Sequence, residues 1–124
     1  TCTSRYRKQQ TQGEEMNEAI PSINIEEVAP DDMLLDVREI DEWEAGHAPN
    51  AVHLALSTLA ESGLEVAEGT RVQVICKVGG RSAQATNYLR SLGIDAVNVS
   101  GGMLAWEQAG QDVVTDSGET GWVS

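Results

Sequence analysis

The 124-residue chain centres on one stretch, Val72-Gln73-Val74-Ile75-Cys76-Lys77-Val78-Gly79-Gly80-Arg81-Ser82. Its first four residues are mostly apolar and rich in β-branched side chains, which is typical of a short buried strand. Residues 83–92 follow with apolar side chains on one side of a helix, at Ala85, Tyr88 and Leu89. The spacing therefore predicts a strand, a tight loop that carries one cysteine, and a helix that begins directly after the loop.

The position of Cys76 favours its thiolate form. The first N–H groups of a helix have no partner within the helix, and the helix dipole places partial positive charge there. Gly79 and Gly80 permit positive φ angles, so the loop can turn its amides toward an anion, and Lys77 and Arg81 add positive charge. The thiolate is the nucleophilic form of cysteine, so Cys76 is a candidate nucleophile. The alternative for this stretch alone is a structural cysteine buried at the end of a strand.

Composition limits the partners that we expect. Eight basic and twenty acidic side chains give a formal net charge of −12, which argues against nucleic acid and anionic membranes. The longest apolar runs, such as residues 33–35, are too short to cross a membrane. Cys2 and Cys76 do not form a disulfide framework, so we expect a cytoplasmic protein. The two histidines and two cysteines are too widely spread to predict a metal site, and no cofactor is expected.

The first fifteen residues differ from the rest of the chain. They are polar, lack apolar periodicity and hold three of the eight basic residues, while Met16 fits a natural start. We therefore expect residues 1–15 to be a disordered leader or an expression-derived tail, and residues 16–124 to form a single domain.

Strand and helix patterns alternate along the predicted domain. Strands are expected at residues 33–37, 51–56, 72–75 and 94–99, and helices at 38–45, 83–92 and 100–109. This alternation predicts an α/β fold with a mainly parallel sheet. Such sheets place functional sites beyond the carboxyl ends of their strands, where Cys76 and the pair Asp36 and Arg38 both fall. His47 lies in a predicted turn, and we expect it to bond to backbone groups rather than act as a base or metal ligand.

Three motifs, in the order of the family, resemble a single rhodanese domain over about residues 20–114. The first is Leu35-Asp36-Val37-Arg38, followed by Glu42-Trp43 and by Gly46-His47-Ala48-Pro49-Asn50-Ala51-Val52-His53. The second, Cys76-Lys77-Val78-Gly79-Gly80-Arg81-Ser82, fits the Cys-x-x-Gly-x-Arg-Ser active loop, and Gly101-Gly102-Met103-Leu104-Ala105-Trp106 is similar to the closing signature. The resemblance implies a three-layer sandwich in which helices flank a mainly parallel sheet of about five strands.

The same resemblance implies a sulfurtransferase of the thiosulfate type. Cys76 would accept a sulfane sulfur from a small anionic donor such as thiosulfate and pass it, as a persulfide, to cyanide or a thiol. The loop that would bind the anion comprises Lys77, Val78, Gly79, Gly80, Arg81 and Ser82. Arg81 is a candidate for anion capture or for a brace paired with Asp36. Ser82 is a candidate helix cap, and Asp36 and Arg38 are expected supports of the site, with the pocket rim as the alternative place for Arg38. We expect a monomer.

Three alternatives remain open from the sequence. Phosphatases of the cell-division-cycle class share the expected fold but have five residues between cysteine and arginine, whereas four separate Cys76 from Arg81 here. A phosphatase or arsenate reductase is therefore less favoured. A non-catalytic rhodanese-like interaction module usually lacks the cysteine, which this chain retains. A persulfide relay to a partner protein is compatible with the acidic charge, which suits a basic partner.

Overall fold

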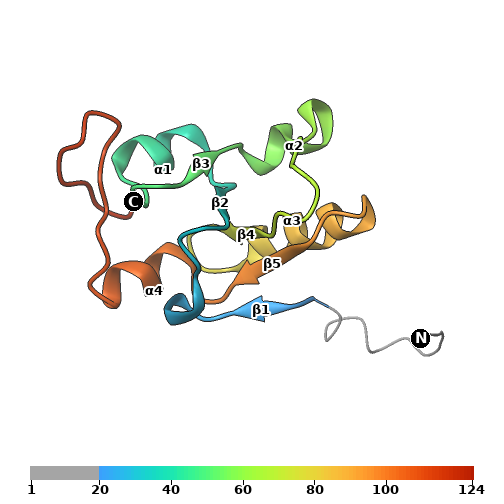
Figure 1. Cartoon of the computed structure of the whole chain (residues 1–124). Helices are drawn as coiled ribbons and strands as arrows, with labels where there is room; N and C mark the ends of the chain where they lie inside the picture. The colour runs from blue at the N-terminus through green and yellow to red at the C-terminus, as the bar shows by residue number, and fades with distance from the viewer. Residues whose placement is uncertain (1–19) are drawn as a thin grey trace.

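The computed structural model describes residues 20–124 and shows an α/β domain built on one five-stranded sheet (Figure 1). The predicted leader, residues 1–15, and Cys2 lie outside the described residues. The elements in chain order are β1 (Ser22–Ile23), the short 3-10 helix η2 (Ile25–Glu27), β2 (Met33–Asp36), α1 (Ile40–Ala45), β3 (Val52–His53), α2 (Leu56–Ser62), β4 (Val72–Ile75), α3 (Gly80–Ser91), β5 (Ala96–Val99) and α4 (Gly102–Gln108).

All strand pairs of the sheet are parallel, in the order β1-β5-β4-β2-β3. The predicted α/β fold with a parallel sheet of about five strands is confirmed. The central strand β4 and its neighbour β5 are buried at every position, as expected for strands covered on both faces. Neither strand alternates apolar and polar residues, and the one polar side chain in each, Gln73 and Asn98, is buried with a hydrogen-bond partner.

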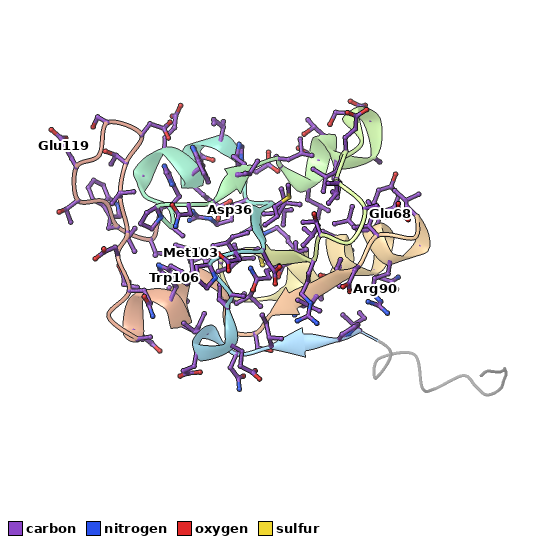
Figure 2. The ribbon with its side chains drawn as sticks, viewed as in Figure 1. Asp36, Glu68, Arg90, Met103, Trp106 and Glu119 are labelled. Atoms are coloured by element: carbon purple, nitrogen blue, oxygen red, sulfur yellow. The ribbon has the colours of Figure 1, made fainter. Side chains whose placement is uncertain are left out.

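Two apolar clusters cover the two faces of the sheet. One brings Leu59 of α2 and Leu89 of α3 against strands β2 and β4, and the other includes Ile25 of η2 and Met103 of α4. Figure 2 shows Met103 near the middle of the molecule, whereas Glu68, Arg90 and Glu119 lie at its periphery. Among residues 20–124, no helix combines the length and the hydrophobicity needed to cross a bilayer.

The predicted boundaries of β2, α1, β5 and α4 differ from the observed ones by one or two residues, and the largest differences are at the end of β3 and the start of α3. Strand β3 covers only Val52–His53 of the predicted 51–56, because the chain turns into α2 at Leu56. Helix α3 begins at Gly80, three residues earlier than predicted, since the N–H of Ala83 already bonds to the carbonyl of Gly79 at 3.0 Å. The earlier start places Arg81 and Ser82 inside the first turn of α3.

The C-terminal segment lies beside α1 (Figure 1). Val114 makes isolated antiparallel bridges to His47 and Thr120, and the N–H of Trp122 bonds to the carbonyl of Ala45 at 3.0 Å. This segment therefore packs on the turn after α1 and adds no strand to the sheet.

Candidate active site

Cys76 directly follows β4, next to the carboxyl end of β2. Asp36 and Ile75 are register partners at the ends of these two strands, and the N–H of Val37 bonds to the carbonyl of Ile75 at 3.0 Å. Cys76 is a free cysteine and is fully buried. Its Sγ lies 3.1 Å from the N–H nitrogen of Gly79 and 3.3 Å from the hydroxyl of Ser82.

The surroundings of Cys76 stabilise its thiolate. Burial raises the pKa of the thiol. Hydrogen bonds from the side chain and backbone of Ser82 and from the amides of Gly79 and Val78 lower the pKa by more than burial raises it. The net pKa of Cys76 lies below its ordinary value of 9.0. The sulfur therefore faces several donors and has the character of a nucleophile.

Only one of the two loop glycines uses a positive φ angle. Gly79 has φ of 120°, which L side chains rarely adopt, whereas Gly80 is not among the residues with positive φ. Gly79 is also the N-cap residue of α3, and no side chain in the described part of the chain caps this helix. The expectation that Ser82 caps the helix is therefore wrong, because Ser82 lies within the first turn, three residues after the N-cap, and its hydroxyl contacts the sulfur.

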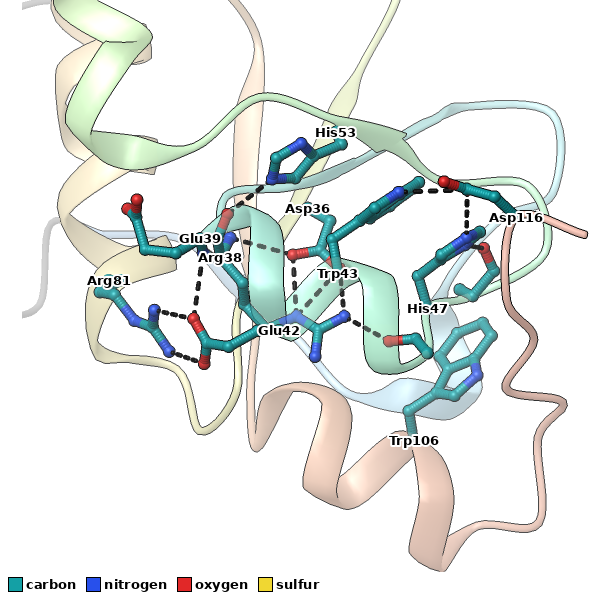
Figure 3. Close-up of polar contacts among 12 residues, drawn as sticks. Asp36, Arg38, Glu39, Glu42, Trp43, His47, His53, Arg81, Trp106 and Asp116 are labelled. Atoms are coloured by element: carbon teal, nitrogen blue, oxygen red, sulfur yellow. Dashed lines mark hydrogen bonds and ion pairs between the residues drawn. The ribbon is translucent and has the colours of Figure 1, made fainter. Parts of the chain in front are cut away.

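Arg81 pairs with Glu42 of α1 rather than with Asp36 (Figure 3). The two hydrogen bonds, at 2.7 and 2.9 Å, form a bidentate ion pair. The predicted Asp36–Arg81 brace is wrong, since the carboxylate of Asp36 is already occupied by Arg38. The hydrogen bond from Arg81 outweighs burial and lowers the pKa of Glu42 to about 2, and the same contact raises the pKa of Arg81 above its ordinary value.

Asp36 and Arg38 form a fully buried ion pair at the end of β2 (Figure 3). The guanidinium donates to both carboxylate oxygens, at 2.8 to 3.1 Å, and its Nη2 also donates to the carbonyl of Gly46 at 2.8 Å. Because Arg38 is fully buried, it does not contribute to a pocket rim. The pair instead ties the end of β2 to the turn after α1.

Lys77 and Val78 form the outer part of the loop. Lys77 is half-buried, and none of the ion pairs within residues 20–124 includes it. Val78 is 60% exposed. Of the two loop cations, Arg81 is bound to a carboxylate and Lys77 keeps its charge available.

The glycines before α4 allow this helix to approach the cysteine loop closely. The N–H of Met103 donates to the carbonyl of Cys76 at 2.7 Å, and that of Leu104 donates to the carbonyl of Lys77 at 3.1 Å. A Cβ on Gly102 would lie 2.5 Å from the Lys77 oxygen and closer still to the Cys76 oxygen. The sequence signal was the Gly101-Gly102 pair at the start of the predicted helix 100–109, but only the structure shows this contact.

Asn98 of β5 lies at the site and was not predicted from the sequence. Its Oδ1 lies 2.5 Å from the hydroxyl of Ser82, and both residues are buried. The available signal was a polar residue within a buried apolar strand, which requires a hydrogen-bond partner.

His47 belongs to a separate polar cluster at the C-terminal segment (Figure 3). Its Nδ1 lies 3.0 Å from the carbonyl oxygen of Ala48, as the predicted backbone role requires, and its Nε2 lies 2.9 Å from Asp116. The ring stacks on Trp43, whose indole N–H donates to the same carboxylate. In the described part of the chain, no three His, Cys, Asp or Glu side chains come together as metal ligands.

Comparison with known proteins agrees with this geometry. Residues 18–109 match the model of the rhodanese-like domain family. An uncharacterized protein of Synechocystis, slr1261, is 41% identical over 83 residues, which are 66% of this chain and 46% of that protein. The putative sulfurtransferase YtwF of Bacillus subtilis is 39% identical over 74 residues, 60% of this chain and 72% of that protein.

A solved structure supports the same assignment. The rhodanese-related protein of Thermoplasma volcanium is 36% identical, with a TM-score of 0.70, and the match covers 77% of this chain and 99% of that one. The matched part of this chain spans about half of the Synechocystis protein. The cysteine loop at the end of a parallel strand, the five-stranded sheet and the match over residues 18–109 together show that this chain belongs to the rhodanese-like domain family.

Proposed function

We propose that this protein is a sulfurtransferase that carries a sulfane sulfur on Cys76. The observation that carries the proposal is the position of the Cys76 sulfur, which faces the N–H of Gly79 and the hydroxyl of Ser82 at the end of β4. The lowered pKa of the thiol supports its role as a nucleophile. The Bacillus subtilis relative YtwF carries the name putative sulfurtransferase, which agrees with this chemistry.

The proposed reaction is a double displacement. The Cys76 thiolate attacks the outer sulfur of thiosulfate, a new S–S bond forms, and the S–S bond of the donor breaks so that sulfite leaves with its electron pair. The enzyme then holds a persulfide anion. Cyanide or a thiolate attacks the outer sulfur of that persulfide, thiocyanate or a new persulfide leaves, and the Cys76 thiolate is restored. Charge and sulfur balance in both steps, and ping-pong kinetics are expected.

Within the loop, Lys77 and the backbone amides are the proposed anion-binding groups. Lys77 has no ion-pair partner in the described part of the chain, so its charge is available to a sulfonate or sulfite group. Arg81 is committed to Glu42 and holds α3 in place rather than capturing the donor. The amides that surround the sulfur stabilise the persulfide anion in the manner of an oxyanion hole.

A thiol on a partner protein is the second candidate acceptor. The exposed side chain of Val78 lies two residues after Cys76 and offers an apolar contact on the cysteine loop. The net charge of −12 favours a basic partner. This alternative changes the acceptor and leaves the first displacement unchanged.

Intact-mass spectrometry after treatment with thiosulfate tests the proposal. We expect a gain of about 32 Da that cyanide reverses with release of thiocyanate. The Cys76→Ser variant should show no gain, whereas Cys2→Ser, which removes the other cysteine of the chain, should behave as the unchanged protein. Absence of an adduct with thiosulfate, polysulfide and 3-mercaptopyruvate, while Cys76 still reacts with an alkylating agent, would overturn the proposal.

A further inference from the structure

The hydroxyl of Ser82 has more acceptors within reach than it has protons. It lies 2.5 Å from Oδ1 of Asn98, 3.2 Å from the carbonyl of Gly79 and 3.3 Å from Sγ of Cys76. A serine hydroxyl has a single proton to donate. When this proton goes to Asn98 or Gly79, the sulfur loses the donor that its anionic form requires.

Of the three neighbours, only Asn98 is able to act as donor as well as acceptor. A backbone carbonyl and a thiolate accept hydrogen bonds and donate none, whereas a carboxamide has an oxygen on one side and an NH₂ group on the other. The two sides are nearly equal in size, so either fits the same space. With its Nδ2 turned toward Ser82, Asn98 donates to the hydroxyl oxygen and leaves the hydroxyl proton for the sulfur.

We propose that Asn98 is a positioning residue for Cys76, and that it acts through Ser82 by directing the hydroxyl proton toward the sulfur. Before thiolate formation, the amide accepts from Ser82. Once Cys76 carries a negative charge, the amide turns and donates to Ser82, and the hydroxyl donates to the sulfur. The role rests on the proposed function, because a sulfurtransferase needs this donor both for the thiolate and for the persulfide.

The position of Asn98 agrees with such a role. It lies on β5, whose backbone is held by β4 on one side and by β1 on the other, and its own N–H bonds to the carbonyl of Pro21 at 2.9 Å. A turn of the amide therefore requires rotation of the side chain alone. The charged group that acts on Cys76 from α3 is Arg81, which is held by Glu42 and does not depend on Asn98.

A double-mutant cycle between Asn98→Leu and Ser82→Ala tests the inference. The readout is the pKa of the Cys76 thiol, followed by thiolate absorbance during a pH titration without any sulfur donor. We expect each single variant to lower the thiolate fraction near neutral pH by about three- to tenfold. The double variant should match Ser82→Ala alone, because Asn98 has no effect once the hydroxyl is gone.

Asn98→Asp provides a second variant of the same shape if Asn98→Leu does not fold. The carboxylate of this variant only accepts hydrogen bonds, so it holds the Ser82 hydroxyl proton and raises the thiol pKa. Adding Ser82→Ala removes the effect that acts through the hydroxyl and leaves only the repulsion between the carboxylate and the thiolate. Gln73→Leu is the matched control, since Gln73 is a buried amide on β4 that bonds to Ala29 and Met33. It should alter stability without altering the thiol pKa.

Two outcomes would overturn the inference. In one, the effects of Asn98→Leu and Ser82→Ala add in the double variant, which would show that Asn98 acts independently of the hydroxyl. In the other, Asn98→Leu leaves the thiol pKa unchanged. Because the titration uses the enzyme without donor, its result does not depend on which sulfur compound the enzyme accepts, and failure of the proposed sulfur transfer is seen separately in the mass experiment.

Discussion

Arg81 and Glu42 are joined by two parallel hydrogen bonds, 2.7 Å from Nη1 to Oε1 and 2.9 Å from Nη2 to Oε2. Glu42 lies in α1, and Arg81 lies in the first turn of α3, directly after the cysteine loop. The pair therefore holds the helix that follows the loop against the helix that follows β2. Bidentate pairs of this kind fix geometry as well as charge, so the loop of Cys76 is restrained from one side by a side chain 39 residues away in the sequence.

Glu42→Gln is expected to slow persulfide formation by about three- to tenfold, because a carboxamide cannot form two charge-assisted bonds to Arg81. Stopped-flow or quenched reaction with thiosulfate measures the rate. Glu44→Gln is the control, since Glu44 lies in the same helix, is exposed and takes part in none of the ion pairs of residues 20–124. An unchanged rate in Glu42→Gln would show that the pair does not organise the loop.

The same ion pair predicts a pH dependence of stability. The pKa of Glu42 is lowered to about 2 in the folded protein, from 4.5, chiefly by the hydrogen bond from Arg81. A lowered pKa adds stability above the unfolded value, and this contribution is lost as the pH falls from about 4.5 toward 2. We expect about 1–2 kcal/mol, reduced by solvent screening at the partly exposed Arg81. In urea unfolding, Glu42→Gln should have a lower free energy of unfolding than the unchanged protein at pH 7, and the two values should converge at low pH. An equal difference in free energy at both pH values would contradict the assignment.

Gly102→Ala should disrupt the cysteine loop. The added Cβ meets the backbone of Cys76 and Lys77 and displaces the N–H of Met103 from the Cys76 carbonyl. We expect a loss of about 2–4 kcal/mol in the free energy of unfolding and a large loss of activity. Gly110→Ala is the matched control, since Gly110 also has a positive φ, 80° against 58°, but open space around its Cβ position. The control should lose about 1 kcal/mol and keep its activity; similar behaviour of the two variants would argue against the close contact.

Lys77→Gln should raise the KM for thiosulfate by about three- to tenfold, since it removes the loop charge that no carboxylate of residues 20–124 neutralises. The effect should shrink at high salt, where charges are screened. Lys77→Arg keeps the charge and should retain most of the affinity. Steady-state kinetics at low and high ionic strength measure both, and a KM that is independent of the charge at residue 77 would exclude this residue from donor capture.

The buried pair of Asp36 and Arg38 predicts strong non-additivity. Arg38→Met leaves the Asp36 carboxylate buried without its partner and should cost about 3–5 kcal/mol. Combining it with Asp36→Leu removes the unpaired charge, so the double variant should be more stable than Arg38→Met alone. Urea unfolding of both single variants and the double variant gives the coupling energy, and simple addition of the two losses would show that the pair is not coupled.

The local sequence was sufficient to predict most of the strands and helices and the place of Cys76 at a strand end. The apolar run before Cys76 predicted β4, because a strand buried on both faces loses its alternation of apolar and polar residues. The start of α3 was misplaced by three residues, since no capping side chain marks it and the turn is made by Gly79 with φ of 120°. A glycine shows that such a turn is permitted, and only the backbone path shows where it occurs.

Partner choice among the charged residues was beyond the sequence. The Asp36–Arg38 pair joins residues two positions apart at the end of β2. Because Asp36 is already paired, Arg81 pairs with another carboxylate, that of Glu42. Glu42 comes within reach only because α1 and α3 both begin near the carboxyl ends of neighbouring strands. Periodicity reports which residues are buried, but it carries no information on which side chains meet.

By itself, the sequence determined the parallel α/β architecture, the place of Cys76 at the end of a strand and the motifs of the family. The tertiary structure alone decided that Glu42 restrains Arg81, that Gly102 lets α4 reach the Cys76 carbonyl, and that Asn98 contacts Ser82. The physical reason is the range of the interactions. Propensity and amphipathic pattern act over one strand or a few helical turns, whereas these contacts join residues 16 to 39 positions apart and depend on how strands align and helices pack.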